Sequence, residues 1–132
     1  AEYHVPPLAH ATMEPMQATA HLVDGKLEIW AGVQGPGFAR AAAAKAAGVA
    51  EENVRLHTTL MGGGFGRRTE VDATVYAAKV AAAMPGTPVV VTWTREEDMA
   101  HGYFRPMASA RIKGSVNLLL VCRGCDIWQV KG

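Results

Sequence analysis

Residues 61–68 read Met-Gly-Gly-Gly-Phe-Gly-Arg-Arg and are the segment best suited to chemistry in this chain of 132 residues. Four glycines in five positions let a ligand approach the main chain closely and allow backbone conformations with φ > 0. A glycine-rich turn between a strand and a helix also directs backbone N–H groups at an anion, with the helix dipole behind them. The guanidinium groups of Arg67 and Arg68 would add donors suited to phosphate. The alternative is a connection that is rich in glycine for steric reasons alone.

The loop matches neither of the two common nucleotide-binding patterns. A P-loop requires a lysine after the last glycine of its motif, and this segment contains no lysine. The dinucleotide-binding fingerprint requires a glycine three residues after its second glycine, but Arg67 occupies that position. The residue types therefore predict an anion or cofactor site without naming its ligand.

Four segments, in the expected order, resemble the large subunit of the molybdenum hydroxylases (xanthine dehydrogenase and aldehyde oxidase). Residues 62–68 are similar to the Gly-Phe-Gly loop of that family, and their Gly-Arg-Arg ending resembles the branch typified by the isoquinoline 1-oxidoreductase β subunit. Residues 7–15 resemble its His-x-x-Met-Glu-Pro segment. Residues 32–36 resemble its Thr-Gln-x-Pro segment, and residues 88–99 resemble its strand ending in Arg-x-x-Asp-Met. The resemblance covers residues 3–114.

The resemblance implies cofactor-binding roles for one side chain and for the loop. It assigns Gln34 to the neighbourhood of the apical oxo ligand of molybdenum, where an amide donor is chemically suited. It places the loop against the metal centre and the pterin through Gly63, Gly64, Phe65, Gly66 and Arg67. Phe65 would also wall the substrate funnel. The alternatives are a glutamine that caps a turn and a core aromatic that anchors the loop, and no catalytic residue is assigned.

The resemblance also implies a reaction, a cofactor and a partner. Members of the family hydroxylate aldehydes or N-heterocycles with a molybdopterin cofactor, in bacteria in its cytosine dinucleotide form. Electrons leave through iron–sulfur clusters on a separate subunit, and the two cysteines of this chain, Cys122 and Cys125, are too few for such clusters. Thr69 stands where xanthine-oxidising relatives carry a substrate-binding glutamate, which argues against purine specificity.

The length of the chain conflicts with that of the family, whose large subunits have several hundred residues. We therefore expect a fragment of such a subunit that is inactive alone, because the second half of the cofactor cradle and a downstream general-base glutamate are missing. Retention of the cofactor by the fragment is left open by the sequence. The alternative function is a non-catalytic anion-binding, nucleotide-binding or assembly module that keeps only the glycine-rich loop.

The elements before the loop follow from local signals. Residues 17–30 alternate in polarity around Asp24 and Gly25, which predicts a hairpin. Residues 38–47 predict an alanine-rich helix that ends at Gly48. Residues 54–60 then predict the strand that leads into the loop.

The elements after the loop are a helix and a strand. The helix is expected to begin between Arg67 and Asp72. Its apolar face is predicted to comprise Val71, Val75, Ala78 and Ala82. Residues 89–93 are β-branched and continuous, as in a strand buried on both faces. The charged cluster that follows predicts a solvated turn with weak ion pairs, whereas the resemblance makes Arg95 and Asp98 framework residues that tie the loop down.

Together these elements predict the α+β class: a two-layer sandwich with a mixed β-sheet and two helices on one face, in ββαβαββ order. Strands linked by a helix should be parallel. Residues 1–16 are expected to be extended coil, and residues 109–113 and 116–121 are expected to form strands. The domain prediction is a fragment of a molybdopterin-binding domain over residues 1–114 and a divergent tail over residues 115–132, with an added strand as one interpretation.

Composition narrows the classes of partner. A net charge of +1 predicts no general affinity for nucleic acid or anionic lipid, and no apolar run reaches the length of a membrane span. His10 and Glu14 are expected to be structural, and His57 a satisfied or surface residue. No histidine shows metal-ligand spacing, and the single C-x-x-C in the tail lacks further ligands. The apolar tail predicts a homo-oligomer.

Overall fold

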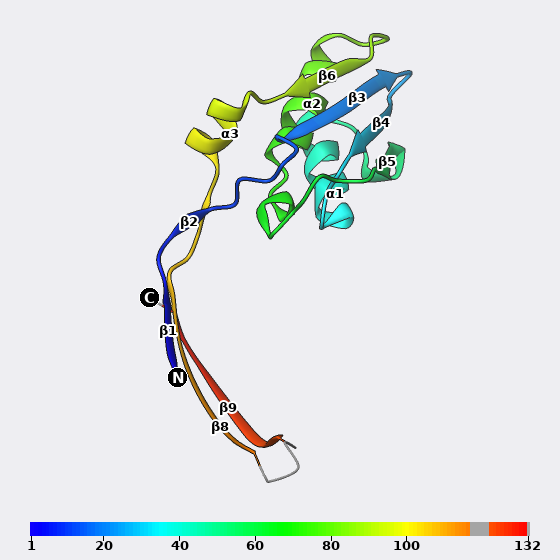
Figure 1. Ribbon diagram of the computed structural model, residues 1–132. Helices are drawn as coiled ribbons and strands as arrows, with labels where there is room; N and C mark the ends of the chain where they lie inside the picture. Colours follow the sequence, from blue (N-terminus) through cyan, green and yellow to red (C-terminus); the bar gives the residue numbers. More distant parts are fainter. Residues whose placement is uncertain (117–121, 132) are drawn as a thin grey trace. The chain divides into compact units, whose positions relative to one another are not determined.

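The computed structural model describes residues 1–116 and 122–131 and divides the chain into two compact units (Figure 1). The larger unit comprises His10–Gly102 and contains the glycine-rich loop. The smaller unit comprises Ala1–Ala9 with Tyr103–Gly132. The larger unit holds a four-stranded sheet, and the smaller unit holds a three-stranded and a two-stranded sheet.

The sheet of the larger unit has the strand order β5-β4-β3-β6. Its strands are β3 (Gln17–Val23), β4 (Lys26–Ala31), β5 (Val54–Thr58) and β6 (Val89–Thr92). The hairpin predicted around Asp24 and Gly25 joins β3 to β4, and both turn residues adopt the positive φ angles of 48° and 74° that such a turn requires. β4 and β5 are parallel, while β3 is antiparallel to both of its neighbours. The predicted mixed sheet is confirmed.

Two helices, α1 (Pro36–Ala47) and α2 (Asp72–Ala83), pack together on one face of this sheet (Figure 1). α1 ends at Gly48, which adopts the left-handed conformation at φ 69°. The α+β class with two helices on one face is therefore confirmed. Within the larger unit the elements β3 to β6 follow the predicted order ββαβαβ, interrupted by the short 3-10 turns η1 (Glu51–Asn53) and η2 (Arg67–Thr69).

The layer between helices and sheet is built largely from alanine. The buried helix residues are Ala39, Ala43, Ala44, Ala73, Thr74, Ala77, Ala78 and Ala81. Such small side chains let the helix axes approach the sheet closely, and the larger Leu27 and Ile29 of β4 fill the remaining space. Of the apolar face predicted for α2, Ala78 is buried in the core, and Val71 and Ala82 are partly buried and pack against it. Val75 is partly exposed and is not among the core residues.

β6 differs from its prediction. It is an edge strand, it pairs antiparallel with β3, and Val90 is 66% exposed. The run of valines predicted burial on both faces, but a strand at the edge of this sheet is covered by the helices on one face only. The expectation that helix-linked strands pair in parallel holds for β4 and β5; β5 and β6 lie at opposite edges.

α3 (Arg95–His101) replaces the predicted solvated turn. Its first turn has a complete capping box: the Thr94 hydroxyl accepts from the N–H of Glu97, and the Glu97 carboxylate accepts from the N–H of Thr94, each at 3.2 Å. Asp98 is only 5% exposed, which contradicts the solvated turn and agrees with the framework position that the resemblance implies.

The smaller unit contains three strands that the sequence did not predict, β1 (Glu2–Val5), β2 (Leu8–Ala9) and β7 (Phe104–Arg105), beside two strands in or near expected positions, β8 (Ala108–Val116) and β9 (Cys122–Lys131). β1 and β9 pair antiparallel with β8, and β2 pairs with β7. The extended coil predicted for residues 1–16 is therefore corrected, because its first part finds hydrogen-bonding partners near the opposite end of the sequence. The strand predicted over residues 109–113 lies within β8, and residues 117–121 lie outside the described part.

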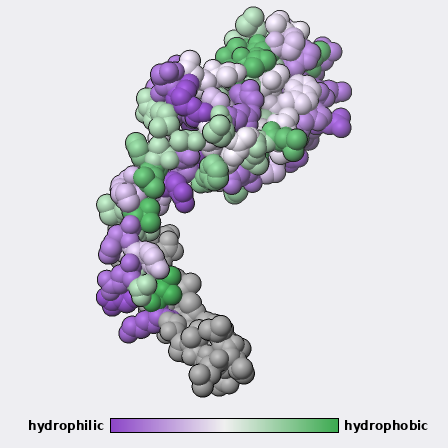
Figure 2. Space-filling view, viewed as in Figure 1, coloured by the Kyte–Doolittle hydropathy of each residue, from purple (hydrophilic) through white to green (hydrophobic). Residues whose placement is uncertain are grey.

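The surface of the larger unit mixes hydrophilic and apolar side chains (Figure 2). Among the described residues, no helix has the length and apolar composition needed to span a membrane.

Candidate functional site

Residues 62–66 connect β5 to η2 and α2 without regular secondary structure, as the change of periodicity predicts. Three of them have φ angles in the left-handed region: Gly63 at 99°, Phe65 at 52° and Gly66 at 96°. This conformation costs a residue with a Cβ about 1–2 kcal/mol. Contacts around the loop must therefore hold Phe65 in place.

Gln34 follows β4 and lies against the loop. Its Oε1 accepts a hydrogen bond from the N–H of Gly66 at 3.0 Å, and its own N–H donates to the carbonyl of Arg68 at 2.9 Å. A Cβ added to Gly64 would lie 2.7 Å from Oε1 of Gln34, closer than Cβ atoms approach their neighbours. The structure thus places Gln34, Gly64 and Gly66 in one site, and it shows why glycine is needed at position 64.

Three successive backbone N–H groups, those of Gly63, Gly64 and Phe65, donate to no acceptor within residues 1–116 and 122–131. Because Oε1 of Gln34 faces Gly66, the donor end of this amide, Nε2, is the end available to a ligand. The side chains of Gln34 and Phe65 are exposed, the latter by 64%. Successive N–H groups in a loop of this kind form a concave donor set for an anionic or oxygen-rich ligand.

Arg68 is fully buried beneath the loop. Its Nε donates to the carbonyl of Gly63 at 2.9 Å, its Nη1 to that of Gly32 at 3.1 Å, and its Nη2 to that of Glu14 at 2.9 Å. The guanidinium group is therefore committed to the protein backbone, and the prediction that it adds an exposed donor for phosphate was wrong.

Arg67, the residue before Arg68, is also buried, with 2% of its surface exposed. Its Nη2 lies 2.7 Å from the carboxylate of Asp72, its Nε lies 4.0 Å from that of Asp98, and its guanidinium stacks 5.4 Å from the centre of the Trp93 ring. These contacts draw the side chain into the protein, which corrects the expectation of an exposed anion donor at the start of the helix. Arg67 instead joins the loop to α2 and α3.

Glu14 was expected to be structural, and its carboxylate contacts the first residue of the loop and Arg68. Its Oε2 accepts from the N–H of Gly62 at 2.7 Å and lies 2.9 Å from Nη2 of Arg68, and its Oε1 accepts from Nε2 of Gln17. Burial raises the pKa of the Glu14 carboxyl, but the hydrogen bonds from Gly62 and Gln17 and the charge of Arg68 outweigh it. The pKa is therefore lowered from its ordinary value of 4.5.

We expect Glu14 to contribute to the loss of stability in acid. Because its pKa is lower in the folded state, its contribution is fully present above pH 4.5 and is lost as the pH falls through the folded-state value. Urea denaturation of the Glu14→Gln variant between about pH 3 and pH 7 should show a shallower decline of the unfolding free energy than the wild type. Glu52→Gln, at an exposed position of η1, should keep the wild-type profile. Parallel curves for Glu14→Gln and the wild type would contradict this role.

Arg95 and Asp98, both in α3, connect this helix to the segment before β3 and to the loop. Nη2 of Arg95 donates to the carbonyl of Met13 at 2.8 Å, and its Nη1 donates to Asp98 at 3.2 Å. Asp98 also lies 4.0 Å from Nε of Arg67, the first residue of η2. These contacts match the framework role that the resemblance implies for Arg95 and Asp98.

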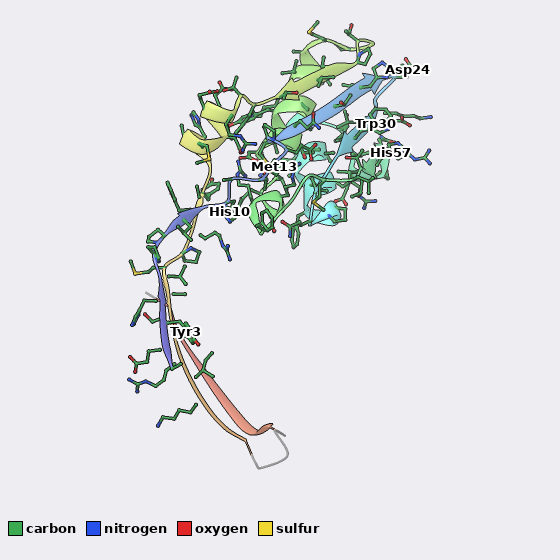
Figure 3. All side chains as sticks on the ribbon, in the orientation of Figure 1. Tyr3, His10, Met13, Asp24, Trp30 and His57 are labelled. Carbon is green, nitrogen blue, oxygen red and sulfur yellow. The ribbon has the colours of Figure 1, made fainter. Side chains whose placement is uncertain are left out.

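His57 lies on the sheet face opposite the helices, beside Trp30 (Figure 3). The two rings stack with centroids 5.0 Å apart and planes within 9°, and Nε2 of His57 lies 3.7 Å from a carboxylate oxygen of Glu28. This nitrogen is buried without a hydrogen bond in the described structure, but the side chain as a whole is 32% exposed, so His57 is a partly exposed residue whose Nε2 is not satisfied. Among the described side chains, no cluster of three His, Cys, Asp or Glu residues could hold a metal ion.

The sequence profile described as "Molybdopterin cofactor-binding domain" matches residues 1–117, which include Gln34 and the whole glycine-rich loop. The chain belongs to the molybdopterin cofactor-binding domain family. The resemblance carried by the four segments is thereby confirmed.

Curated relatives of this molybdopterin cofactor-binding domain include the isoquinoline 1-oxidoreductase subunit beta of Brevundimonas diminuta. That protein is 39% identical over 80% of the present chain. The membrane-bound aldehyde dehydrogenase [pyrroloquinoline-quinone] of Gluconacetobacter polyoxogenes is 38% identical over 85%. The aldehyde oxidoreductase molybdenum-binding subunit of Escherichia coli (strain K12) is 34% identical over 72%.

Solved structures agree with the fold. Quinoline 2-oxidoreductase from Pseudomonas putida 86 superposes with a TM-score of 0.72 and 19% identity over 87% of the chain, and aldehyde oxidoreductase from Desulfovibrio gigas with 0.71 and 23% over 89%. The chain covers 15% and 13% of those two proteins. It also covers 14% of each of the first two curated relatives, so it corresponds to a part of the molybdopterin-binding region of such subunits.

The site fits the cofactor that the family binds. A pterin cofactor with oxygen-rich and phosphate groups requires N–H donors at close range, and the loop presents three of them beside the amide of Gln34. The absence of a Cβ at Gly64 lets the side chain of Gln34 lie directly against the loop.

Proposed function

We propose that this chain contributes the glycine-rich loop and Gln34 to the cofactor site of a molybdopterin-dependent oxidoreductase that hydroxylates aldehydes or N-heterocycles. The observation that carries the proposal is the donor set of residues 63–65 and Gln34 in a chain of this family. The substrate class is supported by relatives named for aldehydes and isoquinoline. A bound molybdopterin supplies a metal centre that activates an oxygen ligand and accepts electrons.

The residues of the chain bind and orient in this proposal. The N–H of Gly66 holds Oε1 of Gln34, so that Nε2 donates to an oxygen of the cofactor. The N–H groups of Gly63, Gly64 and Phe65 donate to the same group, and the exposed Phe65 ring offers an apolar wall to the substrate. Arg67 acts from behind the loop through its contacts with α2 and α3.

The finer points of cofactor and partner also belong to the proposal. We infer the cytosine dinucleotide form of the cofactor and an iron–sulfur subunit as the electron acceptor. The relatives that match are subunits of larger enzymes, which supports a partner subunit. Release of cytidine monophosphate after mild hydrolysis of the purified protein would identify the dinucleotide form.

The direct test is to express the full chain in a bacterium that makes molybdopterin and to measure molybdenum and oxidised pterin per chain after purification. We expect both to co-purify, and neither to do so from a host strain that lacks molybdopterin synthesis. Because one relative is named for pyrroloquinoline quinone, the same extract should be examined for that quinone. Quinone without molybdenum would overturn the proposal, and a clean apo-protein would favour the non-catalytic binding or assembly module.

The loaded chain is expected to show no hydroxylase activity on aldehydes or N-heterocycles by itself. A positioned general base is worth about 10²–10⁴-fold in rate, and the family's glutamate lies beyond the segment that this chain covers. Turnover above that of the metal-free protein would contradict this expectation.

We propose, separately, that the chain forms a homo-oligomer. β9 is an edge strand in the described residues and pairs only with β8, so its other edge can pair with a second copy. Light scattering at roughly tens of micromolar should show a dimer or larger species, as expected for strand-edge association. Deleting residues 115–132 should change this state. A monomeric full-length chain would contradict the proposal.

A further inference from the structure

The fully buried Arg68 and the partly exposed Glu14 form an ion pair, here termed the clamp, at the base of the glycine-rich loop. Arg68 has no exposed surface, and its donors reach backbone carbonyls in three segments: the loop, the end of β4 and the segment before β3. In the segment before β3 its Nη2 contacts the carbonyls of both Glu14 and Pro15, at 2.9 and 3.3 Å. One guanidinium group therefore ties the loop to two neighbouring segments, the end of β4 and the segment before β3.

Glu14 holds the first residue of the loop from both sides. Its carboxylate accepts from the N–H of Gly62 at 2.7 Å, and its own N–H donates to the carbonyl of Gly62 at 3.2 Å. A Cβ at position 62 would lie 2.7 Å from that of Glu14, so the two backbones are in close contact. Gly62 is held by Glu14 and the carbonyl of Gly63 is held by Arg68, so hydrogen bonds fix the base of the loop at two successive residues.

The loop tip, residues 63–65, contributes the N–H groups that have no acceptor in the described structure. Phe65 is held there at a φ of 52°, a conformation that persists only where the surroundings impose it. The backbone carbonyl of Arg68 also receives the N–H of Gln34, so the same residue positions the loop and the neighbouring amide.

We propose that the clamp is a positioning device: it holds the loop tip so that its N–H groups and the amide of Gln34 converge on one ligand. Within the clamp, Arg68 faces the protein interior and donates to backbone carbonyls, while Glu14 is 24% exposed and holds Gly62. For the identity of that ligand the proposal rests on the proposed function, but the conformation of the tip can be measured without any ligand.

The clamp requires arginine rather than a positive charge alone. A guanidinium group presents five N–H donors in a planar fork, whereas the ammonium group of lysine is a compact charge that cannot span the carbonyls of Gly63, Gly32 and Glu14 together. Arg68→Lys keeps the charge but loses the fork. Glu14→Gln keeps the shape and an acceptor for Gly62 but removes the charge.

The experiment compares these two variants of the full chain with Arg40→Lys and Glu51→Gln. Arg40 and Glu51 form an ion pair of the same type at 2.6 Å, but on the surface and about half exposed, so they are matched controls. Amide NMR spectra of the ¹⁵N-labelled proteins should keep the signals of α1, α2 and the sheet in all variants. The signals of residues 63–65 should shift or broaden only in the clamp variants. Molybdenum per chain from a molybdopterin-producing host should fall about tenfold with Arg68→Lys and remain unchanged in the controls.

Unchanged tip signals in folded clamp variants, or displaced tip signals with wild-type molybdenum content, would overturn the proposal. If Arg68→Lys does not fold, Glu14→Gln tests the proposal with the same two measurements. This variant should fold, because it only exchanges one carboxylate oxygen for an amide nitrogen. If the wild type retains no molybdenum, the proposed function fails. The NMR comparison then still shows whether the clamp sets the conformation of the tip.

Discussion

Replacing Gly64 with valine should remove most of the cofactor retained by the chain and leave its fold intact. A Cβ at this position would lie 2.7 Å from Oε1 and 2.8 Å from Cδ of Gln34. The flexible side chain of Gln34 can move aside, so folding continues, but this movement breaks its hydrogen bond with Gly66. Loss of even one buried donor costs about 1–3 kcal/mol, which corresponds to a roughly five- to hundredfold loss of affinity.

The matched control is Gly37→Val. Gly37 lies in the first turn of α1, its added Cβ would meet nothing within 4 Å, and its φ is not positive. The same substitution there should leave molybdenum and pterin content unchanged, while Gln34→Ala should lower them in the same direction as Gly64→Val. Wild-type cofactor content in both Gly64→Val and Gln34→Ala would show that the site lies elsewhere in the chain.

The elements around the site were predictable where the signal is local. Asp24 and Gly25 specify a tight turn by their own backbone preferences, and Gly48 ends α1 by adopting a conformation that other residues avoid. The position of the loop between β5 and α2 follows in the same way from a change of periodicity within a few residues. Each of these features depends on neighbours in the sequence.

Features that depend on distant segments were missed. β1 pairs with β8, which lies more than a hundred residues later, and nothing in residues 2–5 predicts this pairing. The valines of β6 predict burial, but the strand order that leaves Val90 exposed is decided by β3 and β4. Sequence reasoning can propose a strand, whereas its neighbours are set by the whole sheet.

The site also combines residues that the sequence predicts with contacts that depend on distant segments. The sequence predicts Gln34 and the glycines as site residues, because the resemblance covers their segments. The arginines were misjudged because arginine is usually exposed, and only the assembled fold reveals the carbonyls and carboxylates that bury Arg67 and Arg68. Glu14 carried one signal, its position in a Met-Glu-Pro motif of the family, but its contact with Gly62 requires the folded chain.

Replacing Asp98 with alanine should be the most destabilising change in the network behind the loop. Asp98 is 5% exposed, pairs with Arg95 at 3.2 Å and lies 4.0 Å from Arg67, which is itself buried. Removing one partner of a buried ion pair costs about 3–5 kcal/mol, because the remaining charge is left without compensation. Since Arg67 keeps Asp72 at 2.7 Å, we expect the low end, about 3 kcal/mol in the unfolding free energy from urea denaturation.

Glu96→Ala is the control for this prediction, since Glu96 is exposed in the first turn of the same helix, α3. Surface substitutions of this kind change stability by about 0.5 kcal/mol or less, so the difference between the two variants isolates the buried pair from helix propensity and from the dipole of α3. Asp98→Ala should also perturb the amide signals of Arg67 and η2, because the carboxylate helps to hold the Arg67 guanidinium. If both variants unfolded at the same urea concentration, Asp98 would belong to a solvated turn, as its sequence neighbours suggest, and the link from α3 to the loop would carry no energy. A loss confined to Asp98→Ala would establish that the charged cluster after β6 supports the loop from within the fold.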